Sequence, residues 1–167
     1  DPEDADETFL ERVVRRHLAL PWLIAETDRL IIREFSQDDP LEPASAEDAD
    51  GTFSDWNKRE EYRKHQYRFA ECGLWALERR ADGVLVGKAG LTDGELGYHI
   101  YKEYRRRGLA EEACRAIIRR EKEEGRTCVR LQARADNMAS RRLAEKLGFV
   151  QTEEEICSIG SCILYVL

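Results

Sequence analysis

The chain has 167 residues, of which 42% are hydrophobic and 37% are charged. This is the length of one ordinary domain, and a chain of this size can bury enough apolar surface to form a core. The apolar stretches at 18–24 and 162–167 are far shorter than the roughly 20 residues of a membrane span. A net charge of −7 disfavours general binding to the phosphates of nucleic acid. We therefore expect a soluble globular protein with neither nucleic acid nor membrane as a partner.

Cysteine usage indicates a reducing compartment. The five cysteines form no C-x-x-C pair, their number is odd, and they are too sparse for a disulfide framework. Metal sites need clustered cysteine and histidine, so we expect no metal. We predict a cytoplasmic location and free thiols at all five positions, which are Cys72, Cys114, Cys128, Cys157 and Cys162.

The first 25 residues are predicted to form an acidic lead and a short helix, ahead of a single domain over 26–167. Thr8 can cap the helix, because its hydroxyl accepts a hydrogen bond from a free backbone N–H group. Pro21 ends it. One amphipathic face is expected to hold Phe9, Val13, Val14 and Leu18.

Along the rest of the chain, alternating hydrophobic residues predict strands and a period near 3.6 predicts helices. Asp82-Gly83 marks a tight hairpin, and Gly73 stands where a helix is expected to stop. That helix is expected to gather Tyr62, Gln66, Phe69 and Ala70 near one face. The predicted elements are a strand at 27–35, a loop at 36–52, a helix at 58–71, strands at 74–79, 84–91 and 95–101, a helix at 108–124, a strand at 128–134, a helix at 137–147 and closing strands at 149–156 and 161–167.

One predicted helix lies between two predicted strands along the sequence, and this order of elements decides the fold class. The strands at 95–101 and 128–134 flank the helix at 108–124, so they are expected to be parallel and joined by a right-handed crossover. The hairpins around them are antiparallel. We therefore predict a single-domain α+β fold, with a mixed, mostly antiparallel sheet, a central βαβ parallel pair and helices on both faces.

The run R-R-R-G-L-A at 105–110 lies between a predicted strand and the start of a helix. A helix N-terminus carries free N–H groups and a partial positive charge, so it can bind phosphate. Gly108 allows a ligand to approach the backbone closely. The same residues also fit a solvated basic turn, and this segment alone does not decide between the two interpretations.

A second segment, from Asp136 to Ser140, follows the next parallel strand. Asp and Asn are favoured helix caps, so a purely local role is the simpler interpretation of this segment by itself. Adjacent parallel strands, however, bring Gly108 and Asn137 to the same edge of the sheet, where such sheets bind ligands. Two helix starts and an arginine cluster are thus expected around one crevice.

Together these motifs resemble the GNAT N-acetyltransferase superfamily, and within it the branch of ribosomal-protein-alanine N-acetyltransferases. The pyrophosphate signature of that family, Q/R-x-x-G-x-G/A, is matched by Arg105, Gly108 and Ala110. The run Leu-Gly-Tyr at 96–98 resembles the strand that holds the pantetheine arm of the cofactor. The segment 137–149 resembles the helix that follows in that branch.

The resemblance implies an enzyme that transfers acetyl from acetyl-CoA to a primary amine, of a peptide or protein N-terminus or of a small molecule, by direct attack. It implies that backbone N–H groups of 106–110 cradle the pyrophosphate, while backbone groups of 98–100 pair with the pantetheine and polarise the thioester carbonyl. Asn137 is then expected to contact the pantetheine and Ser140 the departing thiolate. The implied cofactor-binding residues are Tyr98, His99, Ile100, Arg105, Arg106, Arg107, Gly108, Leu109, Ala110, Asn137 and Ser140.

The chain differs from the family at the position of the catalytic acid, and its sequence does not identify the catalytic base. Many members carry a tyrosine acid where this chain has Ala144, so Ser140 is the candidate donor. Glu111 stands where the branch often has threonine and brings a carboxylate near the phosphates. Glu95 and His99 share a strand face as candidate bases, although Glu95 also fits an exposed turn residue and His99 a packed ring. Two other functions stay open: a non-catalytic acyl-CoA-binding sensor and an accessory domain of a longer protein.

Overall fold

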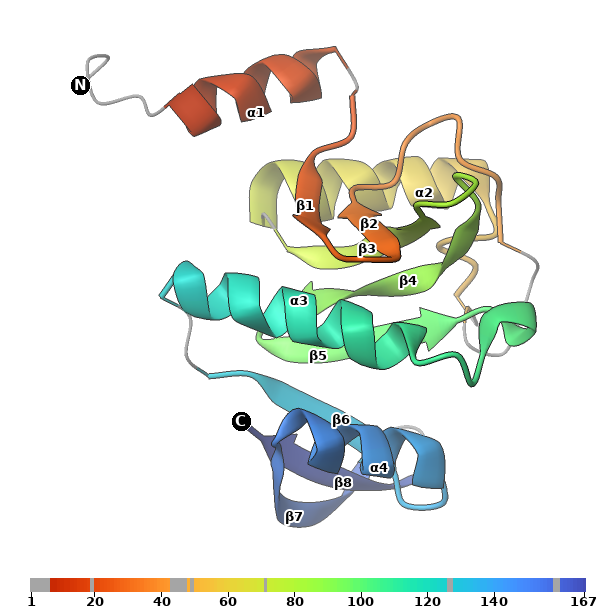
Figure 1. Ribbon diagram of the computed structural model, residues 1–167, viewed down its shortest axis with the longest axis vertical. Coiled ribbons are helices and arrows are strands. Elements are labelled where there is room, and N and C mark those ends of the chain that lie inside the picture. The colour runs from red at the N-terminus through yellow and green to blue at the C-terminus, as the bar shows by residue number, and fades with distance from the viewer. Residues whose placement is uncertain are drawn as a thin grey trace.

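The computed structural model describes residues 7–18, 20–42, 48, 50–70, 72–125, 128–157 and 160–167. Its centre is one eight-stranded sheet in the order β1-β2-β3-β4-β5-β6-β8-β7 (Figure 1). Neighbouring strands are antiparallel except β5 and β6, which are parallel. This confirms the predicted α+β class. The strands are β1 (Leu23–Glu26), β2 (Leu30–Arg33), β3 (Gly73–Arg79), β4 (Leu85–Thr92), β5 (Glu95–Ile100), β6 (Arg130–Arg134), β7 (Val150–Cys157) and β8 (Gly160–Val166).

Helices cover both faces of the sheet. Figure 1 shows α3 and α4 on one face and α2 with η3 on the other, while α1 lies beyond β1. No helix within the described ranges combines the length and the apolarity that crossing a membrane needs. The helices are α1 (Glu7–His17), α2 (Trp56–Tyr62), the π-helix η3 (Arg63–Ala70), the short 3-10 helix η4 (Lys102–Tyr104), α3 (Leu109–Glu123) and α4 (Met138–Leu147).

The core lies between the sheet and these helices. The α3 helix buries Cys114 and Ile117 completely, and the sheet contributes Leu77 and Val86, which are also fully shielded from water. Each such side chain contributes about 1.5–3 kcal/mol to stability relative to an exposed one. The α3 helix is thereby fixed on the central strands, which places its N-terminus at a defined point beside β5.

The strand predicted over 27–35 is wrong in its first part. The chain instead forms a β1–β2 hairpin with a turn after Glu26. The hydroxyl of Thr27 accepts a hydrogen bond from the N–H of Leu30 (2.9 Å), a local bond that competes with strand pairing. Residues 36–42 follow without helix or strand, as predicted for the loop, and 43–47 and 49 of that loop lie outside the described residues.

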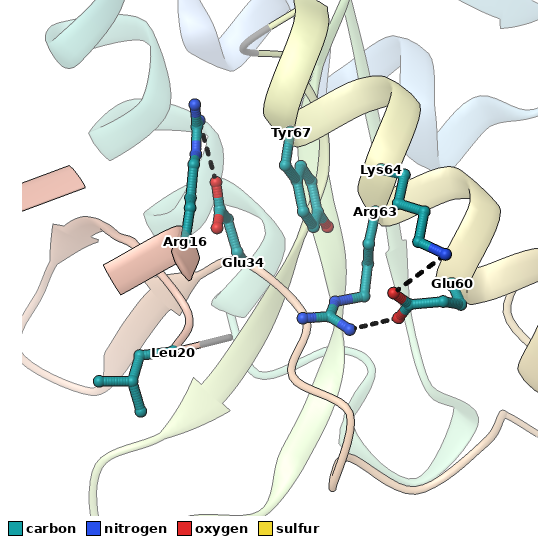
Figure 2. Close-up of a pocket in the computed structure, with 7 residues that line it drawn as sticks. All are labelled: Arg16, Leu20, Glu34, Glu60, Arg63, Lys64 and Tyr67. Atoms are coloured by element: carbon teal, nitrogen blue, oxygen red, sulfur yellow. Dashed lines mark hydrogen bonds and ion pairs between the residues drawn. The ribbon is translucent and has the colours of Figure 1, made fainter. Parts of the chain in front are cut away.

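The helix predicted over 58–71 is present, but its second half is a π-helix, and this changes the residues that face the sheet. A π-turn is wider than an α-turn, so residues five apart align. Tyr62 and Tyr67 therefore both reach Leu74 of β3, whose N–H donates to the Tyr62 hydroxyl and whose carbonyl accepts from Tyr67 (2.6 Å). Tyr67 (Figure 2), which is not among the residues predicted for this face, is buried, and the side chains of 68–71 lie outside the described part.

The prediction that every cysteine is a free thiol is wrong at Cys162. Cys162 on β8 is buried and disulfide-bonded. Cys72, Cys114 and Cys128 are free. The side chain of Cys157 lies outside the described residues.

Candidate active site

A cavity of about 650 Å³ opens where the two parallel strands part. β5 and β6 pair through Glu95 and Arg130, and the Arg130 N–H also donates to the carbonyl of Gly94 (2.8 Å). These contacts hold the amino ends of both strands together. The cavity lies at the carboxyl end of β5, the edge of the sheet at which the sequence predicts a ligand crevice.

Three elements line the cavity: the end of β5 with η4, the turn that leads into α3, and one face of α4. Tyr98 and His99, which alternate to opposite faces of β5, both line it. The lining residues are Tyr98, His99, Ile100, Tyr104, Arg105, Arg106, Gly108, Leu109, Ala110, Glu111, Asn137, Ala139, Ser140, Arg142, Leu143 and Lys146.

The turn before α3 has the backbone of an anion-binding turn. Arg106 and Gly108 both have positive φ, at 61° and 75°, and Gly108 is the N-cap of α3. Successive N–H groups in such a turn and in the first turn of a helix point outward and attract anions. A Cβ on Gly108 would meet the Arg29 guanidinium at 3.5 Å, an ordinary contact. Glycine is therefore favoured here by the left-handed backbone and not by crowding within the protein.

Arg29 holds this turn from outside the cavity. Its guanidinium donates to the carbonyl of Arg107 (2.8 Å) and forms an ion pair with Glu112 of α3. Glu112 also accepts from the hydroxyl of Thr27 (2.6 Å). The β1–β2 turn, the arginine turn and the first turn of α3 are thus tied together, so the N–H groups of α3 keep a fixed direction.

The cavity is cationic although the chain is acidic. Its lining holds one carboxylate, Glu111, and four cationic side chains, which give it a net positive charge; the cations are Arg105, Arg106, Arg142 and Lys146. Lys146, together with Arg115, holds the pKa of Glu111 below its usual range. Such a lining attracts a polyanion, and arginine suits phosphate because its fork of donors matches the phosphate oxygens.

A hydroxyl pair stands on the wall formed by α4. The phenol of Tyr98 donates a hydrogen bond to Ser140 Oγ at 3.1 Å, and the backbone N–H of Ser140 donates to the Asn137 side chain, the N-cap of α4. Burial raises the pKa of Tyr98. The phenol therefore stays protonated and contacts the Ser140 hydroxyl, while Asn137 holds the backbone of Ser140.

His99 reaches the cavity from the opposite face of β5. Its ring centroid lies 5.9 Å from that of Tyr101, and Lys88 of β4 is its cross-strand neighbour. Both Lys88 (2.7 Å) and the Tyr101 hydroxyl (2.9 Å) donate to the buried carboxylate of Glu42. Burial and that carboxylate raise the pKa of Tyr101. This buried cluster fixes the surface against which His99 stands.

The structure brings most of the predicted site residues together. Ten of the eleven predicted cofactor-binding residues line the cavity, Arg107 being the exception. Arg107 instead donates to the carbonyl of Glu103 (3.0 Å) and lies over the Tyr104 ring. Of the two candidate bases, only His99 lines the cavity. Glu95 is exposed at the amino end of β5, four residues and therefore about 13 Å from His99 along the strand.

Five lining residues were not predicted: Tyr104, Ala139, Arg142, Leu143 and Lys146. Four of them lie on α4 with helical spacing, so they share one face of that helix. A signal was present in the sequence, because Asn137 and Ser140 already fix which face of the helix meets the crevice. No group of three or more metal-binding side chains occurs among the residues that the structure describes.

Comparison with known families agrees with this geometry. The family defined as the acetyltransferase (GNAT) domain matches residues 2–150 of the chain. No curated protein sequence matches it. Since the matched range is most of the chain, it includes the arginine turn, α3 and α4.

Solved structures share the fold at low sequence identity. A protein assigned to the GnaT acetyltransferase family from Bordetella pertussis is 23% identical, covers 87% of this chain and 99% of its own, and has a TM-score of 0.65. The ribosomal-protein-S5-alanine acetyltransferase from Vibrio fischeri is 14% identical, with 89% and 96% covered and a TM-score of 0.69. The ribosomal L7/L12 alpha-N-protein acetyltransferase RimL, in complex with coenzyme A, is 11% identical, with 87% and 97% covered and a TM-score of 0.69.

Proposed function

The chain belongs to the GNAT acetyltransferase family, and on that premise we propose that it transfers an acetyl group from acetyl-CoA to a primary amine. The amine is the N-terminus of a peptide or protein, or a small molecule. The observation that carries the proposal is the cationic cavity at the end of β5, with the N-terminus of α3 on one side and the Ser140 hydroxyl on the other.

The cavity's residues fit the chemistry of acetyl-CoA. The N–H groups of the turn at 106–110 and the side chains of Arg105 and Arg106 bind the pyrophosphate. Arg142 and Lys146 add positive charge along α4. The apolar and polar groups at the end of β5 line the path of the pantetheine arm, to which Asn137 is a further neighbour. A related enzyme of the same fold, RimL, has been solved with coenzyme A.

Acetyl-CoA, when bound, supplies the acetyl thioester. The chain's residues act on both its carbonyl group and its sulfur. Backbone N–H groups at 98–100 polarise the thioester carbonyl, which favours attack by the amine nitrogen. Ser140 donates a hydrogen bond to the sulfur that leaves. It thereby takes the role of the tyrosine that many family members carry where this chain has Ala144. His99 accepts the proton that the amine loses, because it is the candidate base that lines the cavity.

Two further expectations remain proposals. The catalytic domain follows the acidic lead and α1 and runs to residue 167, but it starts with β1 at Leu23 and not at residue 26, because β1 pairs with β2 in the sheet. The chain works in the cytoplasm, which the free thiols of Cys72, Cys114 and Cys128 support and the bonded Cys162 counts against.

Two assays on wild type test the function. In the first, acetyl-CoA and free CoA are titrated while the melting temperature is measured, since a ligand that binds only the folded state raises it. In the second, free thiol is followed with acetyl-CoA and a panel of peptides and small amines. An upward shift together with amine-dependent thiol release is expected. Binding of acetyl-CoA without thiol release would indicate a sensor. Absence of both binding and thiol release would indicate an accessory domain. Either result overturns the proposal.

A further inference from the structure

One backbone carbonyl of the turn before α3 is held by a side chain from a distant part of the chain. The guanidinium of Arg29, in the β1–β2 turn, donates to the carbonyl of Arg107 at 2.8 Å. A Cβ on Gly108 would point toward the same guanidinium, at 3.5 Å. Gly108 lines the cavity, whereas Arg29 does not. The Arg107 carbonyl and the Cβ direction of Gly108 therefore both face the outer side of the turn.

The geometry of the peptide bond determines where the next N–H group points. No peptide bond is cis among the described residues, so the peptide between Arg107 and Gly108 is trans. In a planar trans peptide the C=O and N–H groups point in opposite directions. Because the carbonyl faces the outer side, the N–H of Gly108 points to the cavity side, where it can donate to an anion.

Rotation of this one peptide plane would reverse the polarity of the turn. Glycine adopts negative φ as readily as positive φ, so Gly108 does not oppose such a flip. The first hydrogen bond of α3, from the Glu112 N–H to the Gly108 carbonyl (3.1 Å), involves the next peptide and does not oppose it either. A flip would turn the Arg107 carbonyl toward the cavity and replace a donor by an acceptor. It would also break the bond from Arg29, so this bond opposes the flip.

Arg29 is itself fixed to the helix that follows the turn. Its Nε and its backbone N–H both donate to the carboxylate of Glu112, at 2.6 and 3.0 Å. The hydroxyl of Thr27 donates to the same carboxylate at 2.6 Å. The guanidinium can hold Glu112 and the Arg107 carbonyl together because its donors form a rigid fork. The position of Arg29 is therefore defined relative to α3, although its side chain is half exposed.

We propose that Arg29 is a positioning residue for the cofactor, because it locks the peptide between Arg107 and Gly108 in the orientation that presents the Gly108 N–H to the pyrophosphate. This inference rests on the proposed function, since the pyrophosphate is that of acetyl-CoA. Arg29 lies outside the cavity lining and acts through the turn. Without its bond, a fraction of the molecules holds the carbonyl toward the cavity and does not bind. The apparent dissociation constant rises by the inverse of the competent fraction.

Titration calorimetry with CoA measures this effect without an acceptor amine. Arg29→Gln is expected to raise the dissociation constant about 10-fold, as loss of one hydrogen bond from a charged donor does. Arg80→Gln is the control for charge and is expected to leave the constant unchanged. Arg80 is also about half exposed and also contacts the β1–β2 turn, where it pairs with Glu26 (3.0 Å) and donates to the Thr27 carbonyl (3.2 Å).

Thr27→Val is the control for stability. It removes the hydroxyl that donates to Glu112 and that accepts from the N–H of Leu30, but it leaves the bond between Arg29 and the Arg107 carbonyl in place. We expect this variant to melt earlier than wild type and to bind CoA with an unchanged dissociation constant. Melting curves confirm that all the variants fold.

A glycine amide spectrum tests the orientation of the peptide directly. In protein labelled with [15N]glycine, the Gly108 signal is assigned by its absence from the spectrum of Gly108→Ala. Free wild type is expected to give one sharp Gly108 signal. In free Arg29→Gln this signal is expected to shift or broaden, because the N–H group samples two environments. Arg80→Gln is expected to keep the wild-type signal.

The outcomes separate this inference from the proposed function. A wild-type chain that does not bind CoA overturns the proposed function, and the role of Arg29 with it. If wild type binds CoA, an unchanged dissociation constant or an unchanged Gly108 signal in Arg29→Gln overturns the role of Arg29 alone. Equal weakening of CoA binding by Thr27→Val also overturns it, because general loosening of the turn would then explain the loss of affinity.

Discussion

The phenol of Tyr98 on β5 donates its hydrogen bond to the hydroxyl of Ser140 on α4, across 3.1 Å. Because the serine oxygen accepts from the phenol, its own proton is free to point elsewhere, and the cavity lies beside it. This chain has Ala144 at the position where many family members carry a tyrosine acid. In this chain a phenol from the neighbouring strand instead orients the serine that stands close to that place.

Tyr98→Phe removes this orientation without changing the shape of the wall. We expect kcat to fall about 3- to 10-fold, the value of one neutral hydrogen bond, with KM for acetyl-CoA unchanged. Ser140→Ala is expected to cost about 100-fold, as loss of a general acid does. Because Tyr98 acts through Ser140, the double variant falls no further than Ser140→Ala alone. Steady-state kinetics decide this, and additive losses would show that Tyr98 acts independently.

The same pair makes a prediction about pH. Burial raises the pKa of Tyr98 above its ordinary value near 10, so the phenol remains a donor throughout the physiological range. The ratio of wild-type kcat to that of Tyr98→Phe is therefore expected to stay constant from about pH 6 to 9. A ratio that changes within this range would mean that Tyr98 titrates during the reaction.

Gly108 is expected to be essential for the cofactor and only moderately important for stability. Gly108→Val forces a branched side chain into the left-handed backbone, at a cost of about 1–3 kcal/mol, and moves the N–H groups that face the cavity. Gly125, at the other end of α3, also has a positive φ (80°) and open space around it, so Gly125→Val is the matched control. Both variants should melt earlier. Only Gly108→Val should lose the thermal shift with acetyl-CoA, and a retained shift would refute the phosphate site.

Glu111 is predicted to weaken cofactor binding. It is the one carboxylate in the cavity lining, and it holds Lys146 in an ion pair. Glu111→Gln raises the cavity charge by one and releases the lysine, so affinity for CoA should rise about 3- to 10-fold at low salt and less at high salt. Titration calorimetry at two salt concentrations measures it. Glu123→Gln, at the exposed far end of α3, is expected to change nothing.

The two candidate bases can now be separated. His99 lines the cavity, whereas Glu95 stands about 13 Å along the strand from it. His99→Gln is expected to lower kcat/KM about 10- to 100-fold, and Glu95→Gln to leave it unchanged. A large loss with Glu95→Gln and none with His99→Gln would reverse the assignment.

The sequence predicted the parts of the fold that depend on periodicity and on turn residues. The βαβ unit and the hairpin at Asp82-Gly83 were readable, because each follows from a local pattern. The β1–β2 hairpin was not, because the bond between Thr27 and Leu30 breaks a stretch that looks like one strand. The π-helix could not be predicted from the sequence either. Its register is set by the hydrogen bonds of Tyr62 and Tyr67 with Leu74, and a helical period in the sequence does not indicate such contacts.

The candidate site shows the same division. The arginine turn and the Asn137 cap are local motifs, so their meeting at one edge followed from the strand order. The role of Arg29 could not be foreseen, because it joins residues some 80 positions apart. The hydrogen bond between Tyr98 and Ser140 likewise spans 42 positions.

The ion pair of Glu112 with Arg29 makes the turn beside the cavity sensitive to acid. Burial opposes the charge on Glu112, but the hydrogen bonds from Thr27 and Arg29 outweigh it, and the pKa lies below the ordinary 4.5. A carboxyl whose pKa is lowered on folding stabilises the fold above its unfolded pKa. That stabilisation is lost as the pH falls through the folded value.

Glu112→Gln should therefore lower the free energy of unfolding by about 1 kcal/mol at pH 7, a modest value because Arg29 is half exposed. The difference from wild type should shrink as the pH falls below the ordinary pKa of 4.5 and through the lowered pKa of folded Glu112, because the wild-type carboxyl then takes up its proton. Urea titrations at pH 7 and pH 3.5 measure both differences. Glu145→Gln on the exposed side of α4 is the control. A penalty that persists unchanged at the lower pH would mean that Glu112 acts through its shape and not through its charge.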